Sequence, residues 1–222
     1  MKKEYIEITN DLMFPEGPIA MPDGSIILVE IARGTLTQVH KNGSKDIIAE
    51  LGGGPNGAAI GPDGCVYVCN NGGFEWHNID GLLIPGGQGD NYSGGRIEKV
   101  DLKTGSIETI YTECDGNPLK GPNDIVFDKE GNFWFTDLGK QRERDMDRGS
   151  IYWAKSDGSL IKEVIHPIMT PNGIGLSPDE KTLLSTNGVS NDVSFINVEK
   201  LKVEKSIKVG RFPWGVVISP KS

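Results

Sequence analysis

The stretch GPNDIVFDKEGNFWFTD at residues 121–137 contains the pattern that decides the fold. It opens with Pro-Asn, continues through a short apolar run and turns at DKEG. It then ends in a run of aromatic and β-branched residues closed by Asp137. Two strand-like runs joined by a turn that contains Gly indicate a β-hairpin. The sequence therefore predicts a hairpin over residues 122–137.

The same hairpin recurs along the chain and opens each time with a proline. The five prolines stand 40, 67, 49 and 42 residues apart, at Pro15, Pro55, Pro122, Pro171 and Pro213. Further strand-like runs, such as GTLTQVHK and GSIYWAKS, follow the hairpins. A repeat of about 40–50 residues with four short strands is typical of a β-propeller blade. We therefore predict an all-β fold, a β-propeller of four-stranded blades.

The repeats indicate one β-propeller domain over residues 1–222, with about four full blades and a partial one. A single strand is expected at Trp214–Ser219 after the fourth repeat, and another at Glu4–Thr9. The longest interval contains a Gly-rich insertion at about residues 71–94, which is predicted as a long, irregular loop. No helix is predicted.

The composition excludes several classes of protein. The chain has 30 Gly in 222 residues and a net charge of −8, so nucleic acid is not an expected partner. No run of about 18 apolar residues predicts a membrane helix, and no apolar segment follows the basic start as in a signal peptide. The cysteines Cys65, Cys69 and Cys114 fit neither a disulfide framework nor a zinc site. We expect a cytoplasmic protein with reduced thiols.

Each hairpin is expected to place two oxygen-bearing side chains near one end. Residues equidistant from a hairpin turn lie opposite each other. Because the inner strands of a propeller line its central channel, these pairs should converge on one mouth. The predicted pairs are Glu16 with Glu30, Asn56 with Asn70, Asn123 with Asp137, and Asn172 with Asn187.

Carboxylates mixed with amide oxygens, without Cys or His, form a hard ligand set. Such a set is typical of Ca²⁺, or of Mg²⁺ and Mn²⁺ with waters, rather than of zinc or copper. The alternative is that Asn and Asp at strand ends only cap turns or adopt left-handed backbone conformations. Agreement among four repeats, with Glu16 in place of an Asn, favours a metal-binding mouth.

Three motifs resemble those of the gluconolactonase/regucalcin (senescence marker protein) family of six-bladed β-propellers: FPEGP, GPNDIVFDKEGNFWFTD and TPNGIGLSPDEKTL. The resemblance runs from about Phe14 to Leu184, and the tail over residues 187–220 looks more like a YVTN-type propeller repeat. Membership would imply hydrolysis of sugar lactones and related esters, with a small-molecule lactone or ester as the partner. It would also imply one divalent metal, usually Ca²⁺, with Mg²⁺, Mn²⁺ or Zn²⁺ as alternatives.

Carried over residue by residue, the resemblance makes Glu16, Asn172 and Asn187 metal ligands, and Asn123 a further ligand or a substrate contact. The family typically has an acid at position 187, which serves as ligand and general base. An Asn cannot accept a proton near neutral pH, so Asp137 is the best remaining base.

Two further residues are candidate substrate contacts. Asn56 stands in the mouth motif of the second repeat, and His77 lies in the insertion, where a loop entering the mouth would present it. The alternative for His77 is a structural role, packed on the adjacent Trp76.

Two functions remain open at this stage. The first is a metal-dependent lactonase or esterase of the gluconolactonase type, weakened by Asn187 and by the short chain. In it the cation polarises the carbonyl and a bound water attacks. The alternative is a non-catalytic, metal-stabilised propeller that acts as a binding or scaffold module. Because an open propeller leaves strand edges unpaired, we also expect a homo-oligomer, most simply a dimer.

Overall fold

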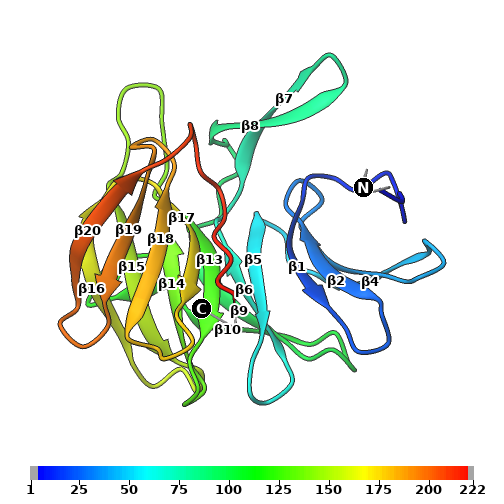
Figure 1. The fold of residues 1–222 in the computed structure, drawn as a ribbon. Coiled ribbons are helices and arrows are strands. Elements are labelled where there is room, and N and C mark those ends of the chain that lie inside the picture. Colours follow the sequence, from blue (N-terminus) through cyan, green and yellow to red (C-terminus); the bar gives the residue numbers. More distant parts are fainter. Residues whose placement is uncertain (1–4, 220–222) are drawn as a thin grey trace.

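The computed structural model describes residues 5–219, and this part of the chain contains strands but no helix (Figure 1). Sixteen strands form four sheets of four antiparallel strands, and each sheet is one blade. The predicted all-β propeller of four-stranded blades is confirmed. No helix in the described residues is long and apolar enough to cross a membrane.

The strands of each blade follow one another from the centre outward, and in the second blade an insertion separates its second and third strands. The first blade contains β1 (Pro15–Ala20), β2 (Ile26–Glu30), β3 (Thr35–Val39) and β4 (Lys45–Glu50). The second contains β5 (Pro55–Ile60), β6 (Val66–Asn70), β9 (Arg96–Val100) and β10 (Ile107–Tyr111). The third contains β13 (Pro122–Phe127), β14 (Asn132–Asp137), β15 (Gly149–Lys155) and β16 (Ile161–Ile168). The fourth contains β17 (Pro171–Leu176), β18 (Thr182–Asn187), β19 (Asp192–Asn197) and β20 (Lys202–Lys208).

Two small hairpins complete the strand list. A short one joins β11 (Glu113–Cys114) to β12 (Asn117–Pro118), and a longer one joins β7 (Phe74–Ile79) to β8 (Leu82–Gln88). The longer hairpin projects from the blades (Figure 1). The predicted irregular loop over 71–94 is therefore wrong in its centre. Asp80 and Gly81 both have positive φ, and an Asp-Gly pair of this kind makes the tight turn of a hairpin.

The two predicted terminal strands are absent from the described residues. Residues 5–9 form no strand, and Glu4 lies outside the described range. Residues 214–219 are not assigned to a strand either. The Trp214 carbonyl nevertheless accepts a hydrogen bond from Gly173 N at 2.8 Å, so this segment runs beside β17.

The core consists of three clusters, each formed between two neighbouring blades. Ile27, Val29 and Val68 belong to the cluster of the first and second blades. Phe133 and Phe135, with no exposed surface, belong to the next cluster together with Tyr67. The last cluster joins the third and fourth blades through residues that include Trp134, Ile174, Leu183 and Ile196. Burial of these apolar faces sets the order of the blades, in which β1 packs beside β5, β5 beside β13, and β13 beside β17.

The register of the first two strands differs from the prediction by one residue. The residues opposite Glu30, Asn70, Asp137 and Asn187 are the motif prolines, not the residues that follow them. The counting was wrong because each first strand contains an irregularity directly after its opening residues. Since consecutive side chains of a strand point to opposite faces, a shift of one residue separates the members of each predicted pair.

Candidate functional site

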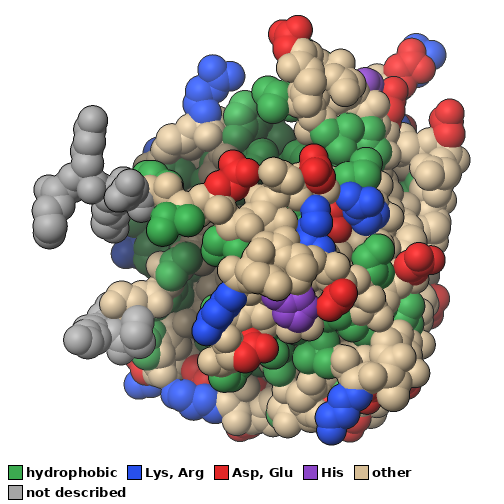
Figure 2. All heavy atoms as spheres, turned by 90° about the vertical axis from the view of Figure 1, so that its right-hand side faces the viewer, with side chains coloured by type: hydrophobic (Ala, Val, Ile, Leu, Met, Phe, Trp, Pro, Cys, Tyr) green, Lys and Arg blue, Asp and Glu red, His purple; other side chains and the backbone are tan. Residues whose placement is uncertain are grey.

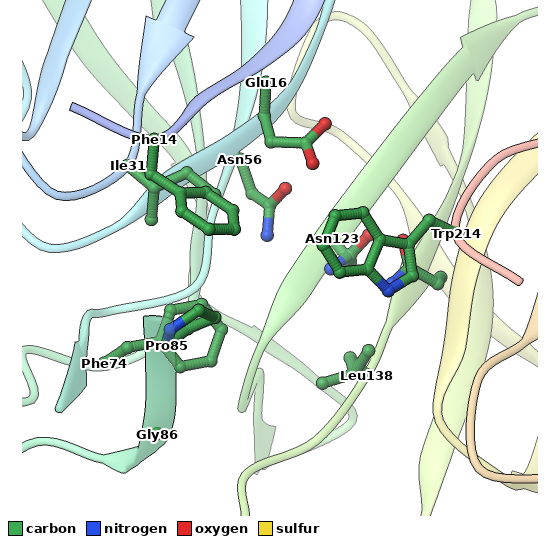
Figure 3. Close-up of a pocket in the computed structure, with 11 residues that line it drawn as sticks. Phe14, Glu16, Ile31, Asn56, Phe74, Pro85, Gly86, Asn123, Leu138 and Trp214 are labelled. Carbon is green, nitrogen blue, oxygen red and sulfur yellow. The ribbon is translucent and has the colours of Figure 1, made fainter. Parts of the chain in front are cut away.

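Four side chains from the four innermost strands meet at one pocket (Figure 3). Each is the second residue of its strand: Glu16 in β1, Asn56 in β5, Asn123 in β13 and Asn172 in β17. The pocket has a volume of about 190 Å³. The structure thus brings together the first members of all four predicted pairs.

The third position of the motif explains how these strands come so close. A Cβ on Gly17 would lie 2.7 Å from Ala58 N, and one on Gly57 would lie 2.4 Å from the Asn123 carbonyl oxygen. A side chain is therefore excluded where the backbone of the next blade approaches. In the third blade this position is Asp124, whose carboxylate instead accepts a hydrogen bond from Ile174 N at 3.0 Å.

The three amide side chains have no hydrogen-bond partner elsewhere in the described residues. Asn56 and Asn123 are nonetheless buried, with 8% and 7% of their surfaces exposed, and Asn172 is half-buried. Their amide atoms are not sealed off, because Asn71 Nδ2 is the one fully buried side-chain nitrogen or oxygen without a partner in the described residues; the three amides therefore remain open to the pocket. Three unpaired amides that line one pocket indicate a site for a ligand.

Glu16 is the carboxylate of this pocket, and its pKa is raised. Burial is the main cause, the Asp124 carboxylate adds repulsion, and the Gly17 N–H partly offsets both. Glu16 is half-buried and has no cationic partner in the part of the chain that the structure describes, so a cation in the pocket would stabilise its charged form.

The donor set fits a hard divalent cation. It contains one carboxylate and three amides that can each present an oxygen, and Ca²⁺ prefers such ligands. Within residues 5–219, no three His, Cys, Asp or Glu side chains are grouped so as to hold a metal ion. Any cation in the mouth would therefore depend on the amide oxygens, which does not favour zinc.

The opposite wall of the pocket is apolar (Figure 3). Phe74 and Pro85 come from the β7–β8 hairpin, Phe14 precedes β1, and Leu138 follows β14. Trp214 completes the wall from the C-terminal segment, with its ring centroid 6.3 Å from that of Phe14. The mouth therefore combines an oxygen-rich side with an apolar side.

Asp137, the residue predicted as a base, does not line this pocket. It is 3% exposed, and its carboxylate accepts backbone hydrogen bonds from Lys120, Gly121 and Gly139 at 2.7–2.9 Å. Burial raises the pKa of Asp137, and the three N–H groups counteract that effect. Its place opposite Pro122 directs the side chain to the loop that leads into β13. The geometry gives Asp137 a structural task.

Asn187 is also held away from the pocket. Its Nδ2 donates to Asp192 Oδ1 at 2.7 Å and to Ser194 Oγ at 2.8 Å, and its Oδ1 accepts from Ser185 at 3.3 Å. The side chain is 2% exposed. All its polar atoms are used within the fourth blade, so we leave Asn187 out of the ligand set proposed below.

Glu30 and Asn70, the second members of the other two predicted pairs, are also held by local hydrogen bonds. Glu30 accepts hydrogen bonds from Met13 N, Thr37 and Arg33, and Asn70 accepts one from Gly54 N. The last residue of every second strand thus ties down nearby loop or strand groups in place of facing the channel.

His77 stands on the outer part of the hairpin, opposite Ile84 in β8. Its side chain is 48% exposed, and its nearest carboxylate, Glu75, lies 3.9 Å away. His77 does not line the pocket. The hairpin contributes Phe74, Pro85 and Gly86 to it instead.

Sequence reasoning missed the apolar wall, although one signal for it was present. Trp214 follows Pro213 as Glu16 follows Pro15, so it occupies the mouth position of the fifth motif. Phe14 directly precedes the first motif. No comparable signal marked Phe74 or Leu138, because their places depend on the hairpin and on the loop after β14.

A family model and several curated proteins match this chain over most of its length. Residues 14–209 match the family model described as "SMP-30/Gluconolactonase/LRE-like region". Among curated proteins, "Lactonase drp35" of Staphylococcus haemolyticus is 28% identical over 197 residues, which are 88% of this chain and 54% of the relative. The protein of the same name from Staphylococcus aureus (strain MRSA252) is 27% identical over 199 residues, with the same coverage. The chain therefore spans about half the length of these relatives.

Solved structures resemble the fold. XC5397 of Xanthomonas campestris, described as a gluconolactonase, superposes with a TM-score of 0.72 at 18% identity, over 94% of this chain and 68% of its own. A chain of a nidogen/laminin complex gives a TM-score of 0.69 at 17% identity, over 93% and 69%. At these identities the likeness concerns the fold alone.

Proposed function

This chain belongs to the SMP-30/gluconolactonase/LRE-like family. We propose that it hydrolyses lactones or related esters at the mouth, with one divalent cation as cofactor and Ca²⁺ as the preferred ion. The observation that carries the proposal is the convergence of Glu16 with three unpaired amides in one pocket. The names of the lactonase and gluconolactonase relatives support the choice of reaction.

Each residue of the mouth has a task in this proposal. Glu16, Asn123 and Asn172 would hold the cation through side-chain oxygens. When bound, a divalent cation supplies Lewis-acid activation of a carbonyl and of water. Asn56 is left to donate an amide hydrogen bond to the oxygen of the substrate carbonyl, where negative charge develops. The apolar wall would hold the rest of the substrate and exclude water.

One observation favours the alternative, a metal-stabilised binding or scaffold module without catalysis. Among the residues of the described range, Glu16 is the only carboxylate that lines the pocket. If Glu16 binds the cation, the pocket itself holds no second carboxylate to accept a proton from the attacking water. Asp124 lines the adjoining cavity, but its carboxylate accepts hydrogen bonds from Ile125 N and Ile174 N. General-base assistance is typically worth about 10²–10⁴-fold in rate, so catalysis without it would be slow.

Hydrolysis of a panel of lactones and aryl esters, with added Ca²⁺ or with EDTA, tests the proposal. We expect hydrolysis to require Ca²⁺ and Glu16→Gln to lower kcat/KM by about 100-fold or more, because even groups that only orient metal ligands are worth about 10–100-fold. Glu75→Gln removes a carboxylate on the hairpin that does not line the pocket, and it should leave activity unchanged.

Two outcomes decide between the readings. Calcium binding without hydrolysis of any panel member would establish the binding module. Hydrolysis that survives both EDTA and Glu16→Gln would contradict the proposed cofactor and ligand set.

A further inference from the structure

Lys140 is a buried lysine in the loop after β14, and it has no carboxylate partner. Its surface is 2% exposed, and it forms no ion pair within the described part of the chain. Its Nζ donates to Asn71 Oδ1 at 3.0 Å and to the Gly73 carbonyl at 2.8 Å. Both acceptors belong to the second blade, at the point where the chain leaves β6 and enters the β7–β8 hairpin.

Two aromatic rings complete the surroundings of this ammonium group. Its nitrogen lies 4.0 Å from the ring centroid of Phe74 and 5.3 Å from that of Tyr92. The faces of aromatic rings attract a cation, which partly compensates for lost water. Burial still lowers the pKa of Lys140 to about 7, against the opposing effect of the Asp137 charge. A lysine held at this cost in a third-blade loop invites a functional explanation.

The other strand of the hairpin is tied to the same loop. Gln88 N, at the end of β8, donates to the Gln141 carbonyl at 2.8 Å. Arg142 contacts the Gln88 side chain at 3.5 Å and is itself fixed by two 3.0 Å hydrogen bonds to Asp147. Both ends of the hairpin are therefore attached to residues 140–142 of the next blade.

These attachments bear on the mouth because the hairpin forms part of its wall. Phe74 follows Gly73, the acceptor of Lys140, and Phe74, Pro85 and Gly86 line the pocket. A two-stranded hairpin alone is at best marginally stable in water. The place of this wall relative to Glu16 must therefore come from contacts at the base of the hairpin.

We propose that Lys140 is a positioning residue that fixes the β7–β8 hairpin as the substrate-facing wall of the mouth. It acts on the substrate only through Phe74 and the strand that follows, and its effect on turnover rests on the proposed lactone hydrolysis. The Nδ2 of Asn71, a buried donor without a partner among residues 5–219, lies at the same junction. An Asp at position 71 would remove that orphan and give Lys140 an ion pair.

The test uses Lys140→Met, which keeps the length of the side chain and removes its hydrogen bonds and charge. Lys205→Met is the matched control, since Lys205 also lies over a ring, that of Phe195 at 4.4 Å, but on β20, outside the pocket. Hydrogen exchange of the full chain is measured over residues 74–88 and over β2. We expect exchange of 74–88 to accelerate by about tenfold or more in Lys140→Met, with β2 unchanged and the control like the wild type.

Kinetics provide the readout that a merely structural role would not move. With a lactone that the wild type hydrolyses, Lys140→Met should raise KM severalfold while kcat stays within about twofold, because the wall binds substrate and transition state alike. Unchanged exchange and unchanged KM in Lys140→Met would overturn the proposal. If no lactone is hydrolysed, the proposed function fails, but the exchange experiment still decides the role of Lys140.

A second variant keeps the proposal falsifiable if Lys140→Met does not fold. Asn71→Asp should fold and should slow exchange over residues 74–88, because a carboxylate replaces the orphaned amide beside the ammonium group. Faster exchange over that segment in Asn71→Asp would contradict the assignment.

Discussion

Asn56, Asn123 and Asn172 are recognisable as a site beside Glu16 because their amides have no partner in residues 5–219, whereas Asp137 and Asn187 have theirs. Sequence spacing brought all six to one end of the blades but could not distinguish the two groups. The distinction depends on the irregularity in each first strand, which shifts the register by one residue. The third residue of the first strand differs between blades. Gly17 leaves room for the backbone of the next blade, whereas the Asp124 carboxylate accepts a hydrogen bond from Ile125 N.

At the residue scale, Asn187→Asp tests whether this position belongs to the metal site. The amide donates to Asp192 and Ser194, so a carboxylate there would lose the hydrogen bond to Asp192 and face its charge, while the Ser194 hydroxyl could still donate to it. We expect a loss of about 1–3 kcal/mol in the free energy of unfolding, measured by urea denaturation at neutral pH, without tighter Ca²⁺ binding. A variant that binds Ca²⁺ more tightly would instead place Asn187 among the ligands, as the family resemblance implied.

Protonation of Lys140 gives a second prediction at this scale. Its pKa is about 7 in the folded chain and near 10.5 in the unfolded chain, so the unfolded state binds more protons between these values. The free energy of unfolding should therefore rise with pH from about 7 toward 10, by at most about 1.4 kcal/mol per pH unit. The neighbouring Asp137, Asp147 and Tyr92 also respond to pH, so the wild type is compared with Lys140→Met. Equal slopes in the two proteins would contradict the lowered pKa.

At the scale of elements, the strands were predictable from their repeat, and the hairpin was predictable only in part. The four-stranded blades follow from alternating apolar runs and Gly-containing turns, which act locally. The Gly-rich ends of the β7–β8 hairpin favoured the prediction of an irregular loop, although the sequence Asp80-Gly81 is typical of a tight hairpin turn. Its docking on residues 140–142 is a contact between blades, which no local pattern records.

Asp137, at the end of β14, connects two loops of the third blade, the one that leads into β13 and the one that follows β14. Asp137→Ala would leave the N–H groups of Lys120, Gly121 and Gly139 without their acceptor. We expect a loss of about 3 kcal/mol or more in the free energy of unfolding, measured by urea denaturation. Asp157→Ala, in an exposed turn, is the control. The Ca²⁺ affinity of the folded variant should match that of the wild type. A large loss of affinity would show that Asp137 contributes to cation binding.

At the scale of the whole molecule, four blades position one mouth between them. Each blade contributes one side chain to the oxygen-rich side, while the hairpin and the segment at Trp214 supply the apolar wall (Figure 3). Figure 2 shows acidic and basic side chains interspersed over the face on the right-hand side of Figure 1, without a broad patch of one sign. The homo-oligomer expected from unpaired strand edges stays a prediction, which light scattering checks against the monomer mass of 24.1 kDa.

The central claim is that the mouth binds a divalent cation through Glu16, and calorimetric titration with Ca²⁺ tests it most directly. We predict one site per chain in the wild type, with affinity falling as pH drops through the raised pKa of Glu16, because protons then compete for the carboxylate. Glu16→Gln should weaken binding by at least about tenfold, and Glu75→Gln should leave it unchanged. Absence of Ca²⁺, Mg²⁺ and Mn²⁺ binding to the wild type, or equal affinity in Glu16→Gln, would contradict the account.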